Sequence, residues 1–163
     1  MYNIGFVKPE KATIKENGIE KEIKWMECYF LIPGFERFQA KLVANKNKSG
    51  DNSPDYYLYR RGRFNKNLSF RDIKIGTLWL KEKNGEKYMS GFMLLGDKEV
   101  RVGVFAAKPL YKGEKLNYLY DIVMFTESQQ NNHDEYSRVE PESDISGESE
   151  YSNIEIDDSE IPF

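Results

Sequence analysis

The last ten residues of the chain combine acidic side chains with an apolar end, and they are well suited to contact a partner. An apolar pocket beside a basic group could take the phenyl ring of Phe163, while its terminal carboxylate meets an Arg or Lys. Pro162 fixes its own φ angle and keeps Ile161 extended, so docking costs little freedom. Burying one Phe is worth roughly 1.5–3 kcal/mol, which suits a weak and exchangeable contact. The predicted partner-binding residues are Asp157, Asp158, Glu160, Ile161, Pro162 and Phe163. The alternative is a solvated acidic tail that merely ends in Phe.

A second set of residues with chemical potential lies between Ile75 and Ala106. Two-residue turns at Asn84-Gly85 and Gly96-Asp97 predict a three-stranded meander there. Because side chains alternate across a strand, this register sorts the meander into two faces. One face is aliphatic and is predicted to be core: Leu78, Leu80, Met89, Met93, Val100, Val102 and Val104. The other, called here the mixed face, holds Thr77, Trp79, Lys81, Tyr88, Ser90, Phe92, Arg101, Gly103 and Phe105.

The mixed face is predicted to bind nucleic acid. A solvated face would not carry this many rings, and a second core face would not carry Lys81 and Arg101. Bases can stack on rings while phosphates meet cations, and base–aromatic stacking is worth roughly 1–3 kcal/mol per base. The residues expected to make these contacts are Trp79, Lys81, Tyr88, Phe92, Arg101 and Phe105. The alternative is that another sheet or a subunit covers the rings and leaves the cations at the rim.

Two basic, glycine-containing loops extend the predicted contacts. They lie around Lys46–Gly50 and Arg60–Arg63 and could follow a phosphate backbone, with contacts that weaken as salt rises. The candidate residues are Lys46, Lys48, Arg60, Arg61 and Arg63. An ordinary solvated loop is the alternative for each.

Charge and aromatic content divide the chain into a body and a tail. Residues 126–163 hold 12 acidic residues and one basic residue, a net charge of −11, whereas residues 1–125 hold 23 basic and 15 acidic residues, a net charge of +8. The body also holds 20 of the 23 aromatic residues. A basic, aromatic body suggests a polyanionic ligand. The polar, acidic tail buries too little apolar surface to fold, which predicts a domain over 1–125 and a flexible tail over 126–163.

The body is predicted to be an all-β antiparallel barrel. The charged segment Lys11–Lys24 is expected to be a hairpin arm or a loop, and a short helix around Asn65–Asp72 is considered. The strand-like runs are Ile23–Ile32, Phe38–Asn45, Tyr56–Arg61, Ile75–Lys81, Lys87–Leu95, Val100–Ala106 and Asn117–Phe125.

The acidic run that closes in Ile161-Pro162-Phe163 resembles the C-terminal tip of bacterial and phage single-stranded DNA-binding proteins. Segments Ser53–Tyr59, Ile75–Leu80 and Lys87–Gly91 also resemble small phage or plasmid proteins of this kind. The resemblance implies an OB-fold, which is a small five-stranded barrel. It also implies binding of single-stranded DNA without sequence preference during replication, recombination or repair, and recruitment of partner proteins through the tip.

The chain departs from the cellular members of that family. Met1–Gly5 is not their usual start, the tail is short and lacks long Gly/Pro/Gln repeats, and the predicted strands outnumber those of a minimal barrel. These departures favour a phage or mobile-element version and leave the oligomeric state open, including a homo-oligomer.

No catalytic, cofactor or metal site is expected. Cys28 and His133 are the only residues of their types, which excludes an internal disulfide framework and makes a Cys/His zinc site implausible. Cys28 is expected to be a small core residue. The spacing in Gly91–Lys98 approaches a phosphate-binding loop, but Asp97 stands where Lys is needed. The start of the chain lacks a signal-peptide pattern and no 18-residue apolar run exists, which predicts a soluble protein of the bacterial or phage-infected cytoplasm with no membrane contact.

Three other functions stay open from the sequence. The first is a protein-interaction module from a phage or plasmid that uses the tip to capture host replication or repair proteins. The second is a cold-shock-like RNA-binding protein. The third is a nuclease that holds Mg²⁺ with Asp55, Asp72 and Asp97.

Overall fold

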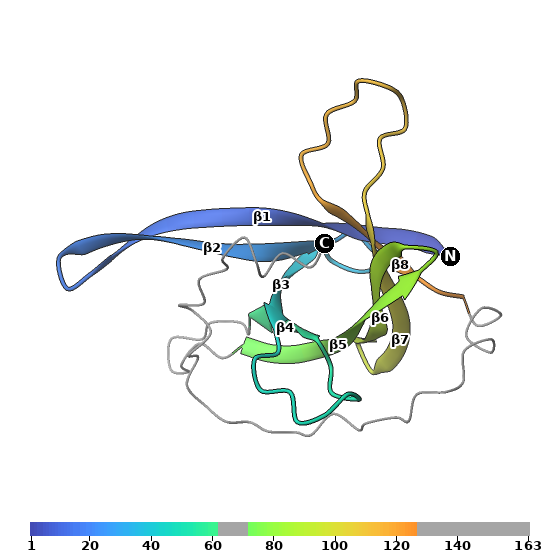
Figure 1. Cartoon of the computed structure of the whole chain (residues 1–163), viewed down its shortest axis with the longest axis horizontal. Helices are drawn as coiled ribbons and strands as arrows, with labels where there is room; N and C mark the ends of the chain where they lie inside the picture. Colours follow the sequence, from blue (N-terminus) through green and yellow to red (C-terminus); the bar gives the residue numbers. More distant parts are fainter. Residues whose placement is uncertain (62–71, 127–163) are drawn as a thin grey trace.

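The computed structural model describes residues 1–61 and 72–126, and these residues form one closed antiparallel barrel (Figure 1). Each strand pairs with the next one in sequence, and the last pairs with the first to close the ring. The all-β antiparallel barrel is thus confirmed, with eight strands in simple up-and-down order where a minimal OB-fold has five. The described residues contain no helix. The strands are β1 (Tyr2–Glu16), β2 (Ile19–Phe30), β3 (Phe38–Ala44), β4 (Tyr56–Arg61), β5 (Asp72–Lys83), β6 (Glu86–Leu95), β7 (Lys98–Ala106) and β8 (Tyr120–Met124).

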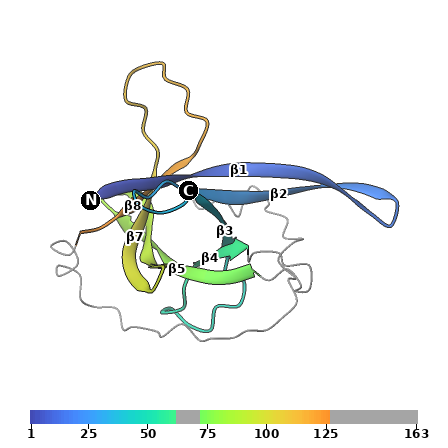
Figure 2. The same ribbon diagram turned by 180° about the vertical axis from the view of Figure 1, so that it is seen from behind.

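Strand β1 is the one strand of the described barrel that the sequence pattern did not predict. Only its first residues, Tyr2–Val7, pair with β8, and the rest pairs with β2 alone. The two strands run beyond the barrel as a long arm (Figures 1 and 2). Its turn residues Asn17 and Gly18 have φ angles of 53° and 78°, as a tight hairpin requires. The hairpin arm expected over Lys11–Lys24 is therefore confirmed. Of the helix considered around Asn65–Asp72, Asp72 lies in β5 and the other residues lie outside the described part.

The predicted register of β5, β6 and β7 is confirmed pair by pair. Asn84 and Gly85 have φ angles of 54° and 78°, the backbone of a type I′ turn, while Gly96 has a φ of 65°, as at the first central position of a type II′ turn. These short turns fix which residues face one another. Both predicted faces of the meander follow from them.

The aliphatic face lines the barrel interior, with one exception. Leu78, Met89, Val102 and their neighbours are buried, but Leu80 is 37% exposed. The prediction of Leu80 as core is wrong because β4 pairs with β5 only as far as Leu78, so Leu80 projects past the end of the barrel wall. Cys28 is fully buried in this interior, as expected, and burial raises the pKa of its thiol. The inward-facing core comprises Ile4, Val7, Met26, Cys28, Phe30, Ile32, Ala40, Leu42, Leu58, Leu78, Met89, Met93, Val102, Val104, Tyr120 and Ile122, with Val100 packed partly buried against it.

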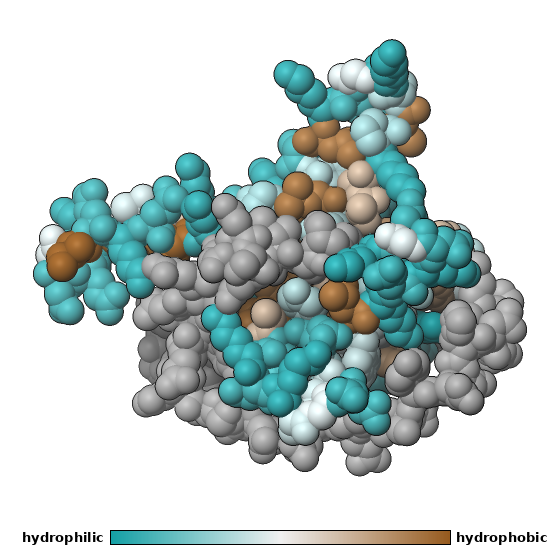
Figure 3. Space-filling view, viewed as in Figure 1, coloured by the Kyte–Doolittle hydropathy of each residue, from teal (hydrophilic) through white to brown (hydrophobic). Residues whose placement is uncertain are grey.

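A long loop between β7 and β8 forms a second projection from the barrel (Figure 1). Its tip carries Leu110 and Tyr111, which are 91% and 68% exposed. The visible surface in Figure 3 is mainly hydrophilic, with apolar atoms gathered on this loop and at the end of the arm.

Candidate nucleic-acid interface

The mixed face lies on the outside of β5, β6 and β7. Trp79, Ser90 and Gly103 form one row across these strands, and Lys81, Tyr88 and Phe105 form the next row. Ser90 is only 4% exposed, so this small residue forms a floor between larger side chains. The six predicted contact residues of this face are all half-buried: Trp79, Lys81, Tyr88, Phe92, Arg101 and Phe105. The surface is therefore neither a solvated face nor a sealed core.

The rings of this face are packed against one another in a defined way. Tyr88 and Phe105 stack with centroids 5.2 Å apart and an interplanar angle of 7°. Gly103 makes room for the rings of Phe105 and Phe125, because a Cβ atom at position 103 would lie 2.6 Å from Cε2 of Phe105 and 3.1 Å from the ring of Phe125. Packed rings lose little freedom when a base stacks on them, which favours their use as a platform.

The mixed face carries two cations, Lys81 on β5 and Arg101 on β7. The pKa of Lys81 is lowered by burial and, to a smaller extent, by the nearby charge of Arg101. The guanidinium of Arg101 lies 5.2 Å from the ring centre of Phe125, a cation–π distance. An anion bound beside either half-buried cation would offset the repulsion that each feels from the other. This arrangement suits a phosphate.

The rings and cations of the mixed face continue around the outside of the barrel onto β4 and past the end of β8, and this larger surface is called here the belt. The sequence pattern did not predict several of its residues. Phe125 follows β8, where its amide donates to the carbonyl of Arg101 at 3.0 Å. Tyr57 and Tyr59 lie on the outside of β4, and the ammonium of Lys74 lies 5.0 Å from the ring centre of Tyr57. The sequence did hold a signal for the two tyrosines. They flank Leu58, and because side chains alternate along a strand, a buried Leu58 places both rings on the outer face. The belt of rings and cations thus continues from β7 to β4.

The β3–β4 loop is tied to the mixed face rather than projecting from it. The indole N–H of Trp79 donates to the carbonyl of Asn52 at 3.0 Å. Lys48 forms an ion pair with Asp55, whose second oxygen accepts a hydrogen bond from the amide of Leu80 at 2.7 Å. The ammonium of Lys48 would have to leave this carboxylate to contact a phosphate.

The remaining predicted contacts lie away from the mixed face or outside the described part. Lys46 is exposed at the start of the β3–β4 loop. Arg60 points toward one end of the barrel, and Arg61 ends β4 in register with Asp72. Residues outside the described part include Arg63, and also Asp157, Asp158, Glu160, Ile161, Pro162 and Phe163.

The outer side of β1 and β2 carries rings whose polar atoms are hydrogen-bonded to carboxylates. The hydroxyl of Tyr29 donates to Glu10 at 2.6 Å, and the indole of Trp25 donates to Glu27 at 2.6 Å. Phe6 stacks on Tyr29 with centroids 5.1 Å apart. Cations accompany these carboxylates, since the ammonium of Lys8 lies 3.6 Å from Glu10 and that of Lys41 lies 5.3 Å from the ring centre of Trp25. The cations on this side are offset by carboxylates, which favours the outer face of β4 to β7 for a polyanion.

The ionisation of Tyr29 tests this carboxylate contact. The hydrogen bond to Glu10, helped by burial, raises the pKa of Tyr29 from 10.0 to about 12. Between these pH values the unfolded chain loses the phenolic proton and the folded chain keeps it, so this contribution to stability falls as pH rises. We expect Glu10→Gln to return the pKa toward 10.0, as followed by the Cζ chemical shift of Tyr29 in ¹³C-tyrosine-labelled protein. An unchanged Tyr29 titration in Glu10→Gln would contradict the assignment.

Comparisons with protein-family models, with curated proteins and with solved structures found no match for the chain. The interface is therefore interpreted from its own residues. In the described part of the chain, no group of three His, Cys, Asp or Glu side chains is placed to hold a metal ion. Within residues 1–61 and 72–126, no helix is long and apolar enough to cross a membrane.

Proposed function

We propose that the chain binds single-stranded DNA without sequence preference along the outer face of β4 to β7. The observation that carries this proposal is that Lys81 and Arg101 share the outer face of β5 to β7 with the stacked rings of Tyr88 and Phe105, around the small residues Ser90 and Gly103. The cations contact phosphates, and the rings of Trp79, Tyr88 and Phe105 present π-faces that any base can use.

The geometry of the belt favours a single strand over a duplex. In a duplex the bases stack on each other, and their faces are closed to protein rings. A single strand can turn its bases toward Tyr88 and Trp79 while its backbone follows the cations. Stacking carries no base identity, so the expected binding is tolerant of sequence.

The proposal also assigns a role to the acidic tip. The resemblance of Ile161-Pro162-Phe163 to the tip of single-stranded DNA-binding proteins supports recruitment of replication, recombination or repair proteins through Asp157–Phe163. Its net negative charge keeps the tail away from DNA on the belt. The chain would then act in the cytoplasm of a bacterium or a phage-infected host, as a phage or plasmid relative of OB-fold proteins of this type.

Tryptophan fluorescence tests the DNA-binding proposal. In a Trp25→Phe background, titration with oligo-dT is expected to quench Trp79, because bases stack beside its indole. Trp79→Ala should weaken binding about tenfold, as the loss of one stacked base predicts. The Trp25→Phe variant serves as the control and should bind like the wild type in a gel shift. No quenching and no gel shift at micromolar protein would overturn the proposal.

A protein-interaction module that uses the tip to capture host proteins is the second candidate function. The rings of Trp25 and Tyr29 favour it, since they form a second aromatic surface whose polar atoms are already hydrogen-bonded to carboxylates. The absence of a gel shift with oligo-dT, together with tip-dependent capture of a replication protein, would favour this function. Competition between dT and U oligomers separates DNA binding from RNA binding.

A further inference from the structure

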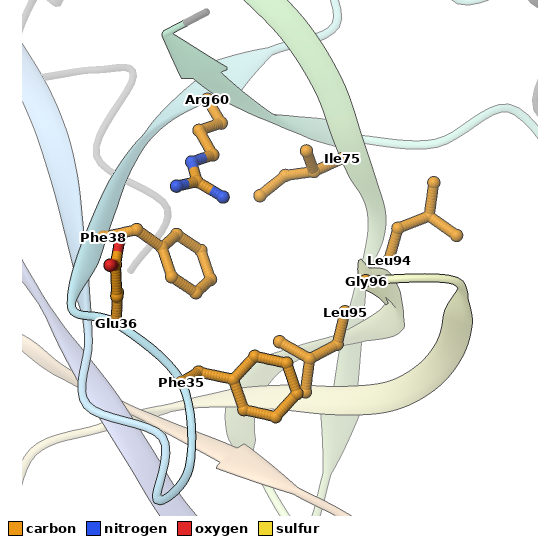
Figure 4. A pocket seen from close by; sticks show the side chains of 8 residues that line it. All are labelled: Phe35, Glu36, Phe38, Arg60, Ile75, Leu94, Leu95 and Gly96. Atoms are coloured by element: carbon orange, nitrogen blue, oxygen red, sulfur yellow. The ribbon is translucent and has the colours of Figure 1, made fainter. Parts of the chain in front are cut away.

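A pocket of about 250 Å³ opens at one end of the barrel, away from the mixed face. The β2–β3 loop contributes Phe35 and Glu36, and β3 contributes Phe38. Ile75 of β5 and Leu95 of β6 complete the apolar walls. In Figure 4 the rings of Phe35 and Phe38 and the side chains of Ile75 and Leu95 surround one opening. Phe35 is 49% exposed at the rim, so the apolar lining is accessible from solvent.

Arg60 places a positive charge at this opening. Its guanidinium carbon lies 4.7 Å from the ring centre of Phe38, and the group points into the space between Phe38 and Ile75 (Figure 4). A guanidinium beside apolar walls attracts an anion more strongly than one in open water. The carboxylate of Glu36 lies at the edge beside Phe38, so the rim also carries a negative charge.

The dimensions of the pocket indicate the class of ligand. Sites for whole small molecules usually measure about 300–1,000 Å³, and this pocket is smaller. It has room for one or two apolar side chains with an anionic group beside them. A peptide in which an apolar residue follows carboxylates has this composition.

We infer that this pocket binds the segment Asp157–Phe163 of the same chain. The segment places the apolar residues Ile161, Pro162 and Phe163 directly after three carboxylates, which matches apolar walls beside Arg60. The phenyl ring lies between Phe35 and Leu95, and a carboxylate of the segment meets the guanidinium. The fit rests on the chemistry of the pocket and does not require nucleic acid to bind the belt.

The covalent link makes this docking feasible despite a small contact. The 34 residues between Thr126 and Ile161 span up to about 110–120 Å when extended, far more than the ~13 Å radius of gyration of a 100-residue domain. Because the segment and the pocket belong to one chain, docking is intramolecular, and linkers that reach their site give effective concentrations up to the millimolar range. Burial of one ring and one charge-assisted hydrogen bond is then enough for substantial occupancy.

Methyl NMR of the full chain tests the inference. The methyl signals of Ile75 and Leu95 should shift in Phe163→Ala, because the ring current of the docked phenyl group is lost. The matched tail control Tyr151→Ala should leave them in place, and the core methyl signals of Leu78 and Val102 should be unchanged in both variants. Equal spectra for the wild type and Phe163→Ala would overturn the inference.

Addition of a peptide of residues 154–163 to the Phe163→Ala chain completes the test. The peptide should restore the wild-type shifts of Ile75 and Leu95 in a saturable way. Arg60→Met should require at least about tenfold more peptide, as loss of a hydrogen bond to a charged group predicts. Arg37→Met, a charge loss outside the pocket lining, should not. Failure of the peptide to bind, or equal effects of the two Arg variants, would contradict the assignment, as would shifts that change on dilution, which indicate a second copy.

Discussion

Arg101→Glu is expected to weaken oligo-dT binding about 100-fold at moderate salt, because it replaces a phosphate contact with a carboxylate that repels the backbone. The basis is that Arg101 shares the mixed face with Lys81, whose pKa is lowered by burial and, to a smaller extent, by the charge of Arg101. The slope of log affinity against log salt should also become shallower by about 0.7–1.4, as loss of one or two phosphate contacts on a single strand predicts. Fluorescence titrations at several salt concentrations measure both effects.

Two control variants separate the site from overall charge. Lys15→Glu makes the same change in net charge on the exposed arm, and we expect it to weaken binding by less than about threefold. Arg101→Lys keeps a cation at the site and should retain most of the affinity. If Arg101→Glu and Lys15→Glu weaken binding equally, the mixed face is not the interface.

Gly91→Ala is expected to destabilise the barrel by about 3 kcal/mol or more, at the upper end of the cost of overpacking. A Cβ atom at Gly91 would lie 1.9 Å from the carbonyl oxygen of Thr77 and 2.9 Å from Cα of Leu78. Both are backbone atoms of the neighbouring strand β5, so no side chain can rotate away. The β5–β6 pairing would have to separate locally, and hydrogen bonds of the ladder would be lost.

Urea unfolding of the two glycine variants measures this effect. Gly50→Ala is the matched control, because a Cβ atom there meets nothing within 4 Å and its φ angle is not in the left-handed region. We expect Gly50→Ala to unfold at the wild-type midpoint or slightly above it. A Gly91→Ala chain as stable as Gly50→Ala would show that β5 and β6 do not approach as closely as described.

The meander of β5 to β7 was predictable because its information is local. Two short turns with Asn84-Gly85 and Gly96 fix the register, and the register alone sorts the two faces. The same reasoning could place Arg60, since it lies two residues after buried Leu58 and therefore points to the same side. The glycine at position 62 instead suggests a loop, and Arg60 is for that reason predicted to be a loop contact.

The remaining features depend on pairings that are distant in the chain. β1 closes the barrel through contacts with β8, which lies about 120 residues away in the chain. Most of β1 belongs to the arm, so only a short stretch of it shows the alternation of buried and exposed residues that predicts a strand. The contact between Arg101 and Phe125 likewise requires β7 and β8 to lie side by side. Irregularities that leave Ile4 of β1 and Ile75 of β5 without a partner in the pairing shift the alternation of these two strands without any signal in the sequence.

The arm explains why residues 11–24 carry so much charge. Beyond Val7 and before Met26, the two strands pair only with each other, so each has an outer edge with backbone groups that the barrel does not use. Such edges invite strand addition by a neighbouring molecule and lead to aggregation. Closely spaced Lys and Glu side chains, with Pro9 near the base, make that addition unfavourable. The arm therefore remains soluble while extending far beyond the ring that supports it.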